Sequence, residues 1–386
     1  MKIGIDARFY GPQSKGLGRY TQKLVEHLED IDQENDYVIF MTARNIDSYT
    51  PRNPRFKKVL ADYKWYTIAE QILFPWTLHK SRCDFVHFPH FNVPLLYLGR
   101  FLVTIHDLIL VRYPTHKAST HSRALYWFKY LMYRMVIASA IYRSKEIFAV
   151  STFTKNDILE HYKIPQDKIH ITLEAGNDIS VDKKEKKSLG DQSVHSIMKP
   201  YFLYVGNAYP HKNVPLLVDA FALFQKQQEG KSQSYHLVLV GREDYFYKEI
   251  RSSIKKKGIK NILIFDTVSN HTLDQLYRHA HAFLFPSLYE GFGLPPLEAC
   301  GYGVPVLSSE AACMPEILGD AVQYCDATSR EIFAKGIQEI TSGAALRKKL
   351  SLAGPHQAKK YSWTDTVQRT HKIYKNQKRI KVKLHE

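Results

Sequence analysis

The chain has 386 residues, and its 54 Lys and Arg residues outnumber its 38 Asp and Glu residues, which gives a formal net charge of +16. With 44% hydrophobic and 24% charged residues the composition is that of a globular chain, and it excludes a disordered or collagen-like protein. Four scattered cysteines without a Cys-x-x-Cys pair exclude a disulfide framework and a zinc site and favour a reducing compartment.

The amino terminus starts directly with a short apolar strand instead of a cationic leader and an apolar segment. No stretch approaches the roughly 18–20 apolar residues of a membrane span. We therefore expect a cytoplasmic protein without a signal peptide or a membrane-spanning helix. Its positive charge calls for an anionic partner, and nucleic acid, acidic lipid and phosphorylated substrates all qualify.

Short runs of β-branched and aromatic residues recur along the chain and predict strands. In the first half they cover residues 2–7, 37–41, 85–88, 101–105, 147–150 and 169–173, and in the second half 201–205, 236–240, 262–265, 282–285 and 305–307. Helix-period segments lie between most of them, among them 20–28, 216–224 and 273–280. Because the strands are apolar throughout and alternate with helices, they predict parallel sheets covered on both faces.

A charged, aperiodic stretch at residues 179–200 predicts a linker, after which the strand–helix rhythm restarts. We therefore expect an α/β protein with two doubly wound, Rossmann-like domains, residues 1–185 and 198–361. Ligands of such sheets bind beyond the carboxyl ends of the strands. The strand-end loops, facing an interdomain cleft, are accordingly where we expect the site.

Two motifs follow strands of the first domain. Gly16 and Gly18 open its first helix, where amides and the helix dipole could bind a phosphate, or where the glycines only form a tight turn. His106 and Asp107 follow the fourth strand. They could hydrogen-bond sugar hydroxyls or transfer a proton, and a strand end facing water is the alternative.

In the second domain, Lys212 comes just after the first strand, where a lysine can neutralise a diphosphate, although most lysines are simply solvated. A more informative segment starts at residue 285 with a strand end and a glycine-rich loop, and continues with two prolines at a helix start. Glu290 lies in that loop, and we expect Glu298 in the first helical turn. The amides of this turn can bind phosphate, and a carboxylate beside them can accept hydrogen bonds from a ribose diol. Glu298 could instead be only a favourable first-turn charge.

Taken together, these motifs resemble glycosyltransferase family 4, the retaining transferases of the GT-B fold. Two glutamates separated by seven residues, Glu290 and Glu298, match the signature of that family. Further matches follow in the right order along almost the whole chain, at residues 5–8, 16–20, 106–107, 150–154, 205–213, 303–309 and 361–363. The resemblance also implies that the last helix, about residues 362–386, completes the first domain.

The resemblance implies a role for each matched residue of the donor site. Glu298 would hold the ribose, Glu290 the hydroxyls of the transferred sugar, and Lys212 the leaving diphosphate. The loop and helix start beneath the sugar and phosphates would add the amides of Gly291, Phe292, Gly293 and Leu294, and further donor contacts would come from Asn207, His211 and Val268.

The first domain would contribute the remaining contacts by the same resemblance. Gly16 and Gly18 would cap the diphosphate, His106 would touch the donor sugar near its anomeric carbon, and Asp107 would face the acceptor. Many relatives have arginines where this chain has Asn207 and His211, so Arg242 or Arg19 would have to replace that charge.

The family reaction is a front-face displacement that keeps the anomeric configuration. Because no Asp-x-Asp motif ends a strand, we expect neither a divalent metal nor another cofactor. The spacing around Lys212 is similar to that of mannosyltransferases and favours GDP-mannose as donor, with a lipid-linked or polysaccharide acceptor in cell-surface glycan synthesis. A UDP- or ADP-sugar donor, a nucleotide-sugar epimerase or hydrolase of the same fold, and a nucleic-acid-binding protein are the alternatives.

The excess of positive charge lies mainly in two stretches. Residues 50–145 contain seven Lys and eight Arg against four acidic residues, and residues 346–386 contain twelve Lys and Arg against two. Two aromatic and basic helical segments, residues 65–80 and 123–143, fall in the first stretch. They predict a peripheral surface resting on anionic lipid at the inner face of the cell membrane, the alternative being ordinary core helices with solvated basic faces. With the charge placed in this way, nucleic acid is no longer a leading candidate for the anionic partner.

Overall fold

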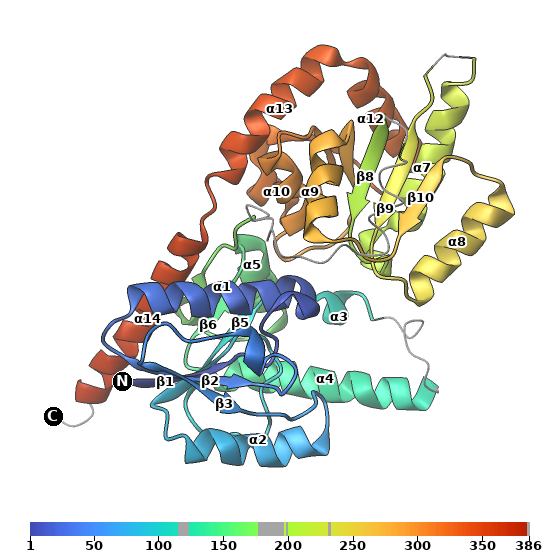
Figure 1. Ribbon diagram of the computed structural model, residues 1–386. Helices are drawn as coiled ribbons and strands as arrows, with labels where there is room; N and C mark the ends of the chain where they lie inside the picture. Colours follow the sequence, from blue (N-terminus) through green and yellow to red (C-terminus); the bar gives the residue numbers. More distant parts are fainter. Residues whose placement is uncertain (115–122, 177–196, 198–199, 231–232, 384–386) are drawn as a thin grey trace. The chain divides into compact units, whose positions relative to one another are not determined.

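A computed structural model describes residues 1–114, 123–176, 197, 200–230 and 233–383 (Figure 1). The chain divides into two compact units. The first comprises Met1–Val111, His121–Glu174 and Ser362–Glu386, and the second Arg112–Thr120 and Ala175–Tyr361. Of the linker predicted at residues 179–200, all but residues 197 and 200 lie outside the described part of the chain.

A parallel sheet of order β3-β2-β1-β4-β5-β6-β7 forms the centre of the first unit. Its strands are β1 (Lys2–Asp6), β2 (Asp36–Met41), β3 (Phe56–Leu60), β4 (Phe85–Phe88), β5 (Phe101–Ile105), β6 (Ile147–Ala149) and β7 (Ile169–Ile171). The sequence predicted each of them except β3. This edge strand carries Lys57 and Lys58, so it lacks the apolar run that marks the buried strands.

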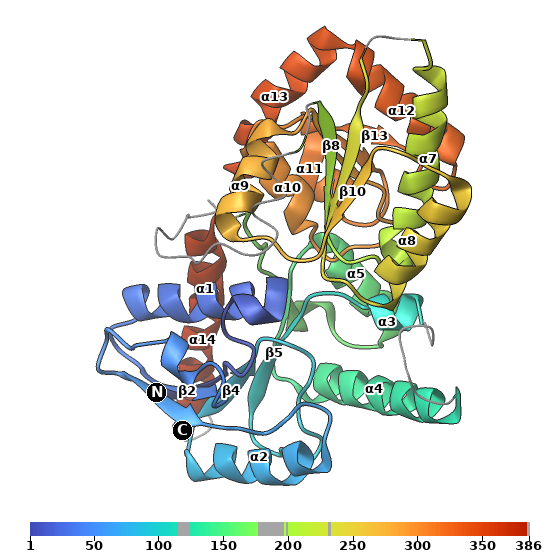
Figure 2. The same ribbon diagram turned by 45° about the vertical axis from the view of Figure 1, so that its right-hand side comes forward.

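Helices cover both faces of this sheet. They are α1 (Lys15–Ile31), α2 (Ile68–Lys80), α3 (Ile109–Arg112), α4 (Arg123–Arg143), α5 (Thr152–His161) and α14 (Trp363–Lys383), with 3-10 turns η1 (Pro12–Ser14), η2 (Ile46–Ser48) and η3 (Gln166–Lys168). Alternate residues of β4 face opposite layers: His87 contacts Tyr374 of α14, whereas Phe88 packs against Phe74 of α2. Accordingly α1 and α14 pack together on one face, and α2 and α4 share a hydrophobic core on the other (Figures 1 and 2).

The second unit is built around a parallel sheet of order β10-β9-β8-β11-β12-β13. The strands are β8 (Tyr201–Val205), β9 (His236–Val240), β10 (Ile262–Phe265), β11 (Ala282–Phe285), β12 (Val306–Ser309) and β13 (Gln323–Cys325). Its helices are α7 (Val214–Gln227), α8 (Tyr245–Lys257), α9 (Asn270–His279), α10 (Leu294–Gly301), α11 (Met314–Leu318), α12 (Arg330–Ser342) and α13 (Ala344–Ala358), with η4 (Pro210–Lys212) and η5 (Gly319–Ala321). Two doubly wound parallel sheets confirm the predicted fold class.

The strand order of each sheet reverses once, between β1 and β4 in the first unit and between β8 and β11 in the second. At such a switch point the loops leave neighbouring strands in opposite directions, which opens a crevice at the carboxyl ends. The residues after β8 and β11 are therefore the ones to compare with the predicted donor site. Among the helices of the described residues, none combines the length and apolar content needed to cross a bilayer.

Candidate functional site

Lys212 and Glu290 meet at the switch point of the second sheet. Lys212 ends η4, just after β8, and Glu290 lies in the loop after β11. The Nζ of Lys212 is 2.5 Å from Oε1 of Glu290, and their side chains are only 13% and 9% exposed. The sequence predicts both residues for a donor site, and the structure adds that they form an ion pair.

Ser287 orients Glu290 within this ion pair. Its hydroxyl donates to Oε1 of Glu290 at 2.7 Å, and Ser287 is fully buried. The amide of Leu288 donates to the carbonyl of His211 at 2.7 Å, which ties the loop after β11 to η4. Sequence reasoning did not assign Ser287, although its place two residues after the end of β11, in the matched segment, was a signal for it.

The loop between Glu290 and α10 requires a glycine at its end. Gly293 precedes the helix with a φ of 86°, in the left-handed region that side chains other than glycine rarely adopt. Pro295 and Pro296 follow at the helix start, as predicted, and neither has an N–H group. Any amides offered to a phosphate here must therefore come mainly from the loop and from Leu294.

Glu298 lies one turn further along α10 than the sequence suggested. The helix begins at Leu294, so Glu298 is its fifth residue, and the first turn contains no acidic residue. The prediction of a first-turn position was wrong, and the interpretation as a simple first-turn charge is wrong with it. Glu298 is 5% exposed, and its Oε2 accepts a hydrogen bond from the hydroxyl of Tyr277 in α9 at 3.2 Å.

The family resemblance would place arginines at the positions of Asn207 and His211, and neither residue supplies a positive charge here. The carbonyl of Asn207 accepts a 2.7 Å hydrogen bond from Tyr204, and its side chain accepts one from the amide of Tyr209. Burial, and then the charge of Lys212, lower the pKa of His211 to about 3. His211 is therefore neutral at physiological pH and supplies no charge to replace an arginine.

Two further candidates lie at the carboxyl edge of the same sheet. Arg242 is exposed two residues after the end of β9. Val268 is half-buried just before α9, beside Ser269, whose side chain caps that helix. Their roles toward a donor stay predictions.

In the first unit, both ring nitrogens of His106 face acceptors. Nδ1 lies 2.7 Å from Oε1 of Glu174, and Nε2 lies 2.9 Å from the carbonyl oxygen of Pro89. Burial by itself lowers the pKa of His106, but the hydrogen bond and charge of Glu174 and the Pro89 carbonyl raise it overall. The geometry therefore favours an imidazolium that donates from both nitrogens.

Glu174 was missed by sequence reasoning. It follows β7, 68 residues after His106, and the two meet because β5 and β7 end at the same edge of the sheet. Asp107, next to His106, accepts a hydrogen bond from the amide of Ile109 at 3.0 Å and so helps to begin α3.

Gly16 and Gly18 lie in the first turn of α1. A Cβ atom on Gly18 would lie 2.0 Å from the carbonyl oxygen of Gly11, so the close approach of the preceding loop already requires a glycine there. The tight-turn interpretation accounts for Gly18, and binding of a phosphate by this turn stays a prediction.

A buried ionic cluster occupies the switch point of the first sheet. Arg8, after β1, forms two 2.8 Å contacts with the carboxylate of Asp6 and one with Oε1 of Glu70 in α2. Asn92, after β4, donates to the same Glu70 oxygen at 2.8 Å. Because the side chains of Arg8 and Glu70 are fully buried, this network fixes the strand ends of the first unit.

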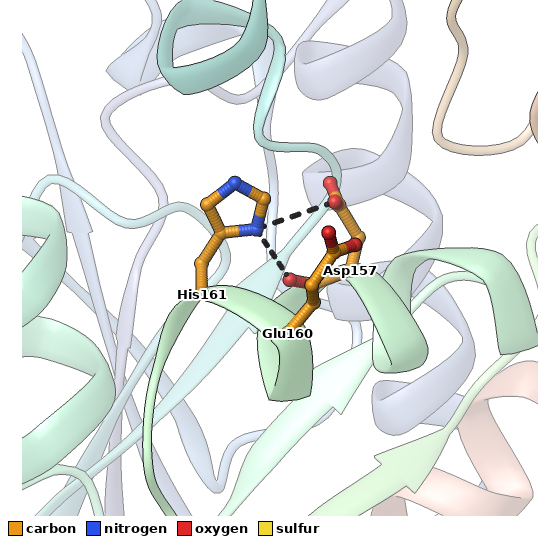
Figure 3. A group of neighbouring side chains, drawn as sticks. All are labelled: Asp157, Glu160 and His161. Atoms are coloured by element: carbon orange, nitrogen blue, oxygen red, sulfur yellow. Dashed lines mark hydrogen bonds and ion pairs between the residues drawn. The ribbon is translucent and has the colours of Figure 1, made fainter.

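Asp157, Glu160 and His161 form a group on α5 with ligand atoms within 4.8 Å of one another (Figure 3). All three come from consecutive turns of one helix. Nδ1 of His161 is 2.9 Å from the carbonyl oxygen of Asp157 and 3.4 Å from its carboxylate. These are the local contacts expected four residues apart on a helix, and they do not by themselves indicate a metal site.

An open depression of about 540 Å³ lies at the opposite edge of the second sheet from Lys212. Its lining includes Pro200, His281 and Pro305, which precede β8, β11 and β12. It therefore faces the amino ends of the strands, away from the Lys212–Glu290 pair.

Two family models and several curated relatives match this chain. The family described as Glycosyltransferase Family 4 matches residues 14–172, and Glycosyl transferases group 1 matches residues 186–357. The O-antigen chain mannosyltransferase B of Escherichia coli is 27% identical over 93% of this chain and 96% of its own length. The O-antigen chain mannosyltransferase RfbU of Salmonella typhimurium is 26% identical over 86% and 88%.

The fold is shared with a solved structure. The sucrose-phosphate synthase of Thermosynechococcus elongatus superimposes with a TM-score of 0.74 and 16% identity, covering 97% of this chain and 98% of that one.

Proposed function

Because the chain belongs to glycosyltransferase family 4 and has the GT-B fold, we propose that it transfers mannose from GDP-mannose to a glycan hydroxyl. The acceptor is a lipid-linked or polysaccharide chain of an O-antigen or capsule type. The names of the two bacterial relatives support mannose as the sugar. The observation that carries the proposal is the largely buried Lys212–Glu290 pair at the switch point of the second sheet.

In the proposed reaction the anomeric carbon exchanges one oxygen for another on the same face. The bond to the diphosphate breaks, and its electron pair leaves on the diphosphate oxygen. The acceptor hydroxyl forms the new bond and passes its proton to the departing phosphate, so the configuration is retained. The protein contributes positioning and charge stabilisation, and the proposal requires no divalent metal.

Binding of the donor would exchange the partners of the Lys212–Glu290 pair. Lys212 would turn from the carboxylate to the diphosphate, whose charge grows as the bond breaks. Glu290 would then accept hydrogen bonds from hydroxyls of the sugar, held in place by Ser287 at 2.7 Å. Glu298, with the Tyr277 hydroxyl 3.2 Å away, would accept hydrogen bonds from the ribose.

A transfer assay tests the proposal. GDP release from GDP-mannose is measured with and without a set of octyl glycosides as acceptors, in the presence and absence of EDTA. We expect release that depends on an acceptor, is unaffected by EDTA, and yields an α-mannoside by NMR. Release that is the same without acceptor would support a hydrolase, and an inverted or EDTA-sensitive reaction would contradict the mechanism.

We also propose that the protein acts at the inner face of the cytoplasmic membrane, where a lipid-linked acceptor is held. The absence of acidic residues from α4 and the basic stretches described above support this location.

A further inference from the structure

A hydrogen bond from α9 anchors Glu298 in α10. The hydroxyl of Tyr277, in the last turn of α9, donates to Oε2 of Glu298 at 3.2 Å. Tyr277 is fully buried and Glu298 is nearly so, and water therefore cannot readily replace either partner. The two residues are 21 apart in the chain and come from helices that lie side by side (Figures 1 and 2). The bond therefore ties the Glu298 carboxylate to a second helix.

The ring of Tyr277 is held by a stacked neighbour. Tyr302, which follows α10, stacks on Tyr277 with ring centroids 5.2 Å apart and planes 5° from parallel. The hydroxyl of Tyr302 donates to Oδ1 of Asp274 at 3.0 Å, and Cζ of Arg278 lies 5.1 Å from the centre of the Tyr302 ring. The two stacked rings therefore present their hydroxyls to different carboxylates, and only one of these is Glu298.

Glu298 gains from such an anchor because it lies one turn inside α10. Helical side chains lean towards the amino end of their helix, which for α10 is the end that follows the loop after β11. An unrestrained glutamate side chain has three rotatable bonds and loses rotamer freedom when it binds a ligand. A partner that already fixes the carboxylate lowers that loss, so the ligand is bound more tightly.

We infer that Tyr277 is a positioning residue, which holds the Glu298 carboxylate in the orientation that accepts the hydroxyls of a nucleotide ribose. The inference rests on the proposed function, because that function assigns the ribose to Glu298. A tyrosine with a purely structural role would also satisfy its buried hydroxyl with a nearby acceptor. Removal of that hydroxyl would then affect ligands with and without ribose hydroxyls alike, whereas a positioning role affects only the former.

Titration calorimetry of the full chain with GDP and with 2′,3′-dideoxy-GDP tests the inference. Tyr277→Phe removes the hydroxyl and keeps the stacked ring. We expect about a 3- to 10-fold higher Kd for GDP, which corresponds to immobilising one side chain, and a Kd for 2′,3′-dideoxy-GDP within about twofold of the original. In transfer from GDP-mannose, KM should rise by the same factor while kcat stays unchanged, because the ribose is bound alike in the ground state and the transition state.

The matched control is Tyr302→Phe, which removes the same group from the other stacked ring. The Tyr302 hydroxyl faces Asp274, so the Kd for both ligands should stay unchanged. A second background completes a double-mutant cycle: in Glu298→Ala, the further change Tyr277→Phe should not alter the Kd for GDP, because the carboxylate that Tyr277 positions is gone. Melting curves show whether each variant is folded at the titration temperature.

Three results would overturn the inference. They are an unchanged Kd for GDP in Tyr277→Phe, an equal loss of affinity for GDP and 2′,3′-dideoxy-GDP, and a loss of the same size in Tyr302→Phe. An unaltered chain that binds GDP but whose affinity does not respond to Tyr277→Phe would leave the proposed function standing. A chain that does not bind GDP at all would contradict the proposed function together with the inference, so the two failures are distinguishable.

Discussion

The two members of the Lys212–Glu290 pair should affect the binding of GDP in opposite directions. In the free protein the Lys212 ammonium is 2.5 Å from the Glu290 carboxylate. To bind, the diphosphate of GDP must replace the Glu290 carboxylate as the partner of Lys212. The bound diphosphate then lies close to the negative charge of Glu290. Lys212→Met should therefore weaken GDP binding, and Glu290→Gln should strengthen it, although Glu290→Gln loses sugar transfer.

The expected change in the Kd for GDP follows from the burial of the Lys212–Glu290 pair. A hydrogen bond to a charged group contributes about 1.5–3 kcal/mol. Lys212 is only 13% exposed, so solvent screens this contact little, and the full range applies. Loss of the contact corresponds to about a 10- to 150-fold higher Kd for GDP, since each 1.4 kcal/mol is about tenfold.

Isothermal titration with GDP measures both effects. Lys335→Met, which removes a lysine that is 77% exposed on α12, is the matched control and should leave Kd unchanged. Melting curves of all three variants show whether each is folded at the titration temperature. If Lys212→Met and Glu290→Gln both left Kd unchanged, or both weakened binding alike, the pair would be a structural ion pair only.

Three further predictions concern stability. The pKa of His106 in the folded protein lies above its ordinary value of 6.5, so protonation of His106 stabilises the fold. This stabilisation is fully present below pH 6.5 and is lost as the pH rises through the pKa that His106 has in the folded protein. Glu174→Gln should remove that dependence in urea unfolding, and identical pH profiles would contradict it. Gly293 and the remote Gly258 both have a positive φ, so Gly293→Ala and Gly258→Ala should each lower the free energy of unfolding by about 1–2 kcal/mol. Only Gly293→Ala should also weaken GDP binding. Arg8→Met leaves the buried carboxylates of Asp6 and Glu70 without their cation and should lower the free energy of unfolding by about 3–5 kcal/mol, measured by calorimetry. A melting point within about 2 °C of the original would correspond to a loss on the order of 1 kcal/mol and would contradict this prediction.

Which residues would lie at strand ends could be predicted from local sequence, because apolar runs and the glycines after them are contiguous in the chain. Lys212 and Glu290 were found in this way. The pairing of Lys212 with Glu290 could not be predicted in this way, because it depends on β8 lying next to β11, and no local pattern encodes that strand order.

The errors have local physical causes. β3 and β13 are edge strands that are only partly buried, so an apolar run does not mark them. Glu298 was placed in the wrong turn because α10 begins at Leu294, directly after the left-handed Gly293. Glu174 was missed because its partner His106 is 68 residues away and a single carboxylate after a strand has no distinctive signature.

The central claim, that GDP-mannose is the donor, is tested most directly by a thermal-shift panel of GDP-mannose, UDP-glucose, ADP-glucose and dTDP-rhamnose. A ligand at 100 times its Kd stabilises the folded state by about 2.7 kcal/mol, or roughly 5–10 °C for a unit of this size. We predict a shift of that size for GDP-mannose alone, and a shift of about half that size or less in Lys212→Met at the same ligand concentration, because a 10- to 150-fold higher Kd leaves about 0.3–1.4 kcal/mol of stabilisation. A shift only with another sugar nucleotide, or with none of the four, would contradict the claim.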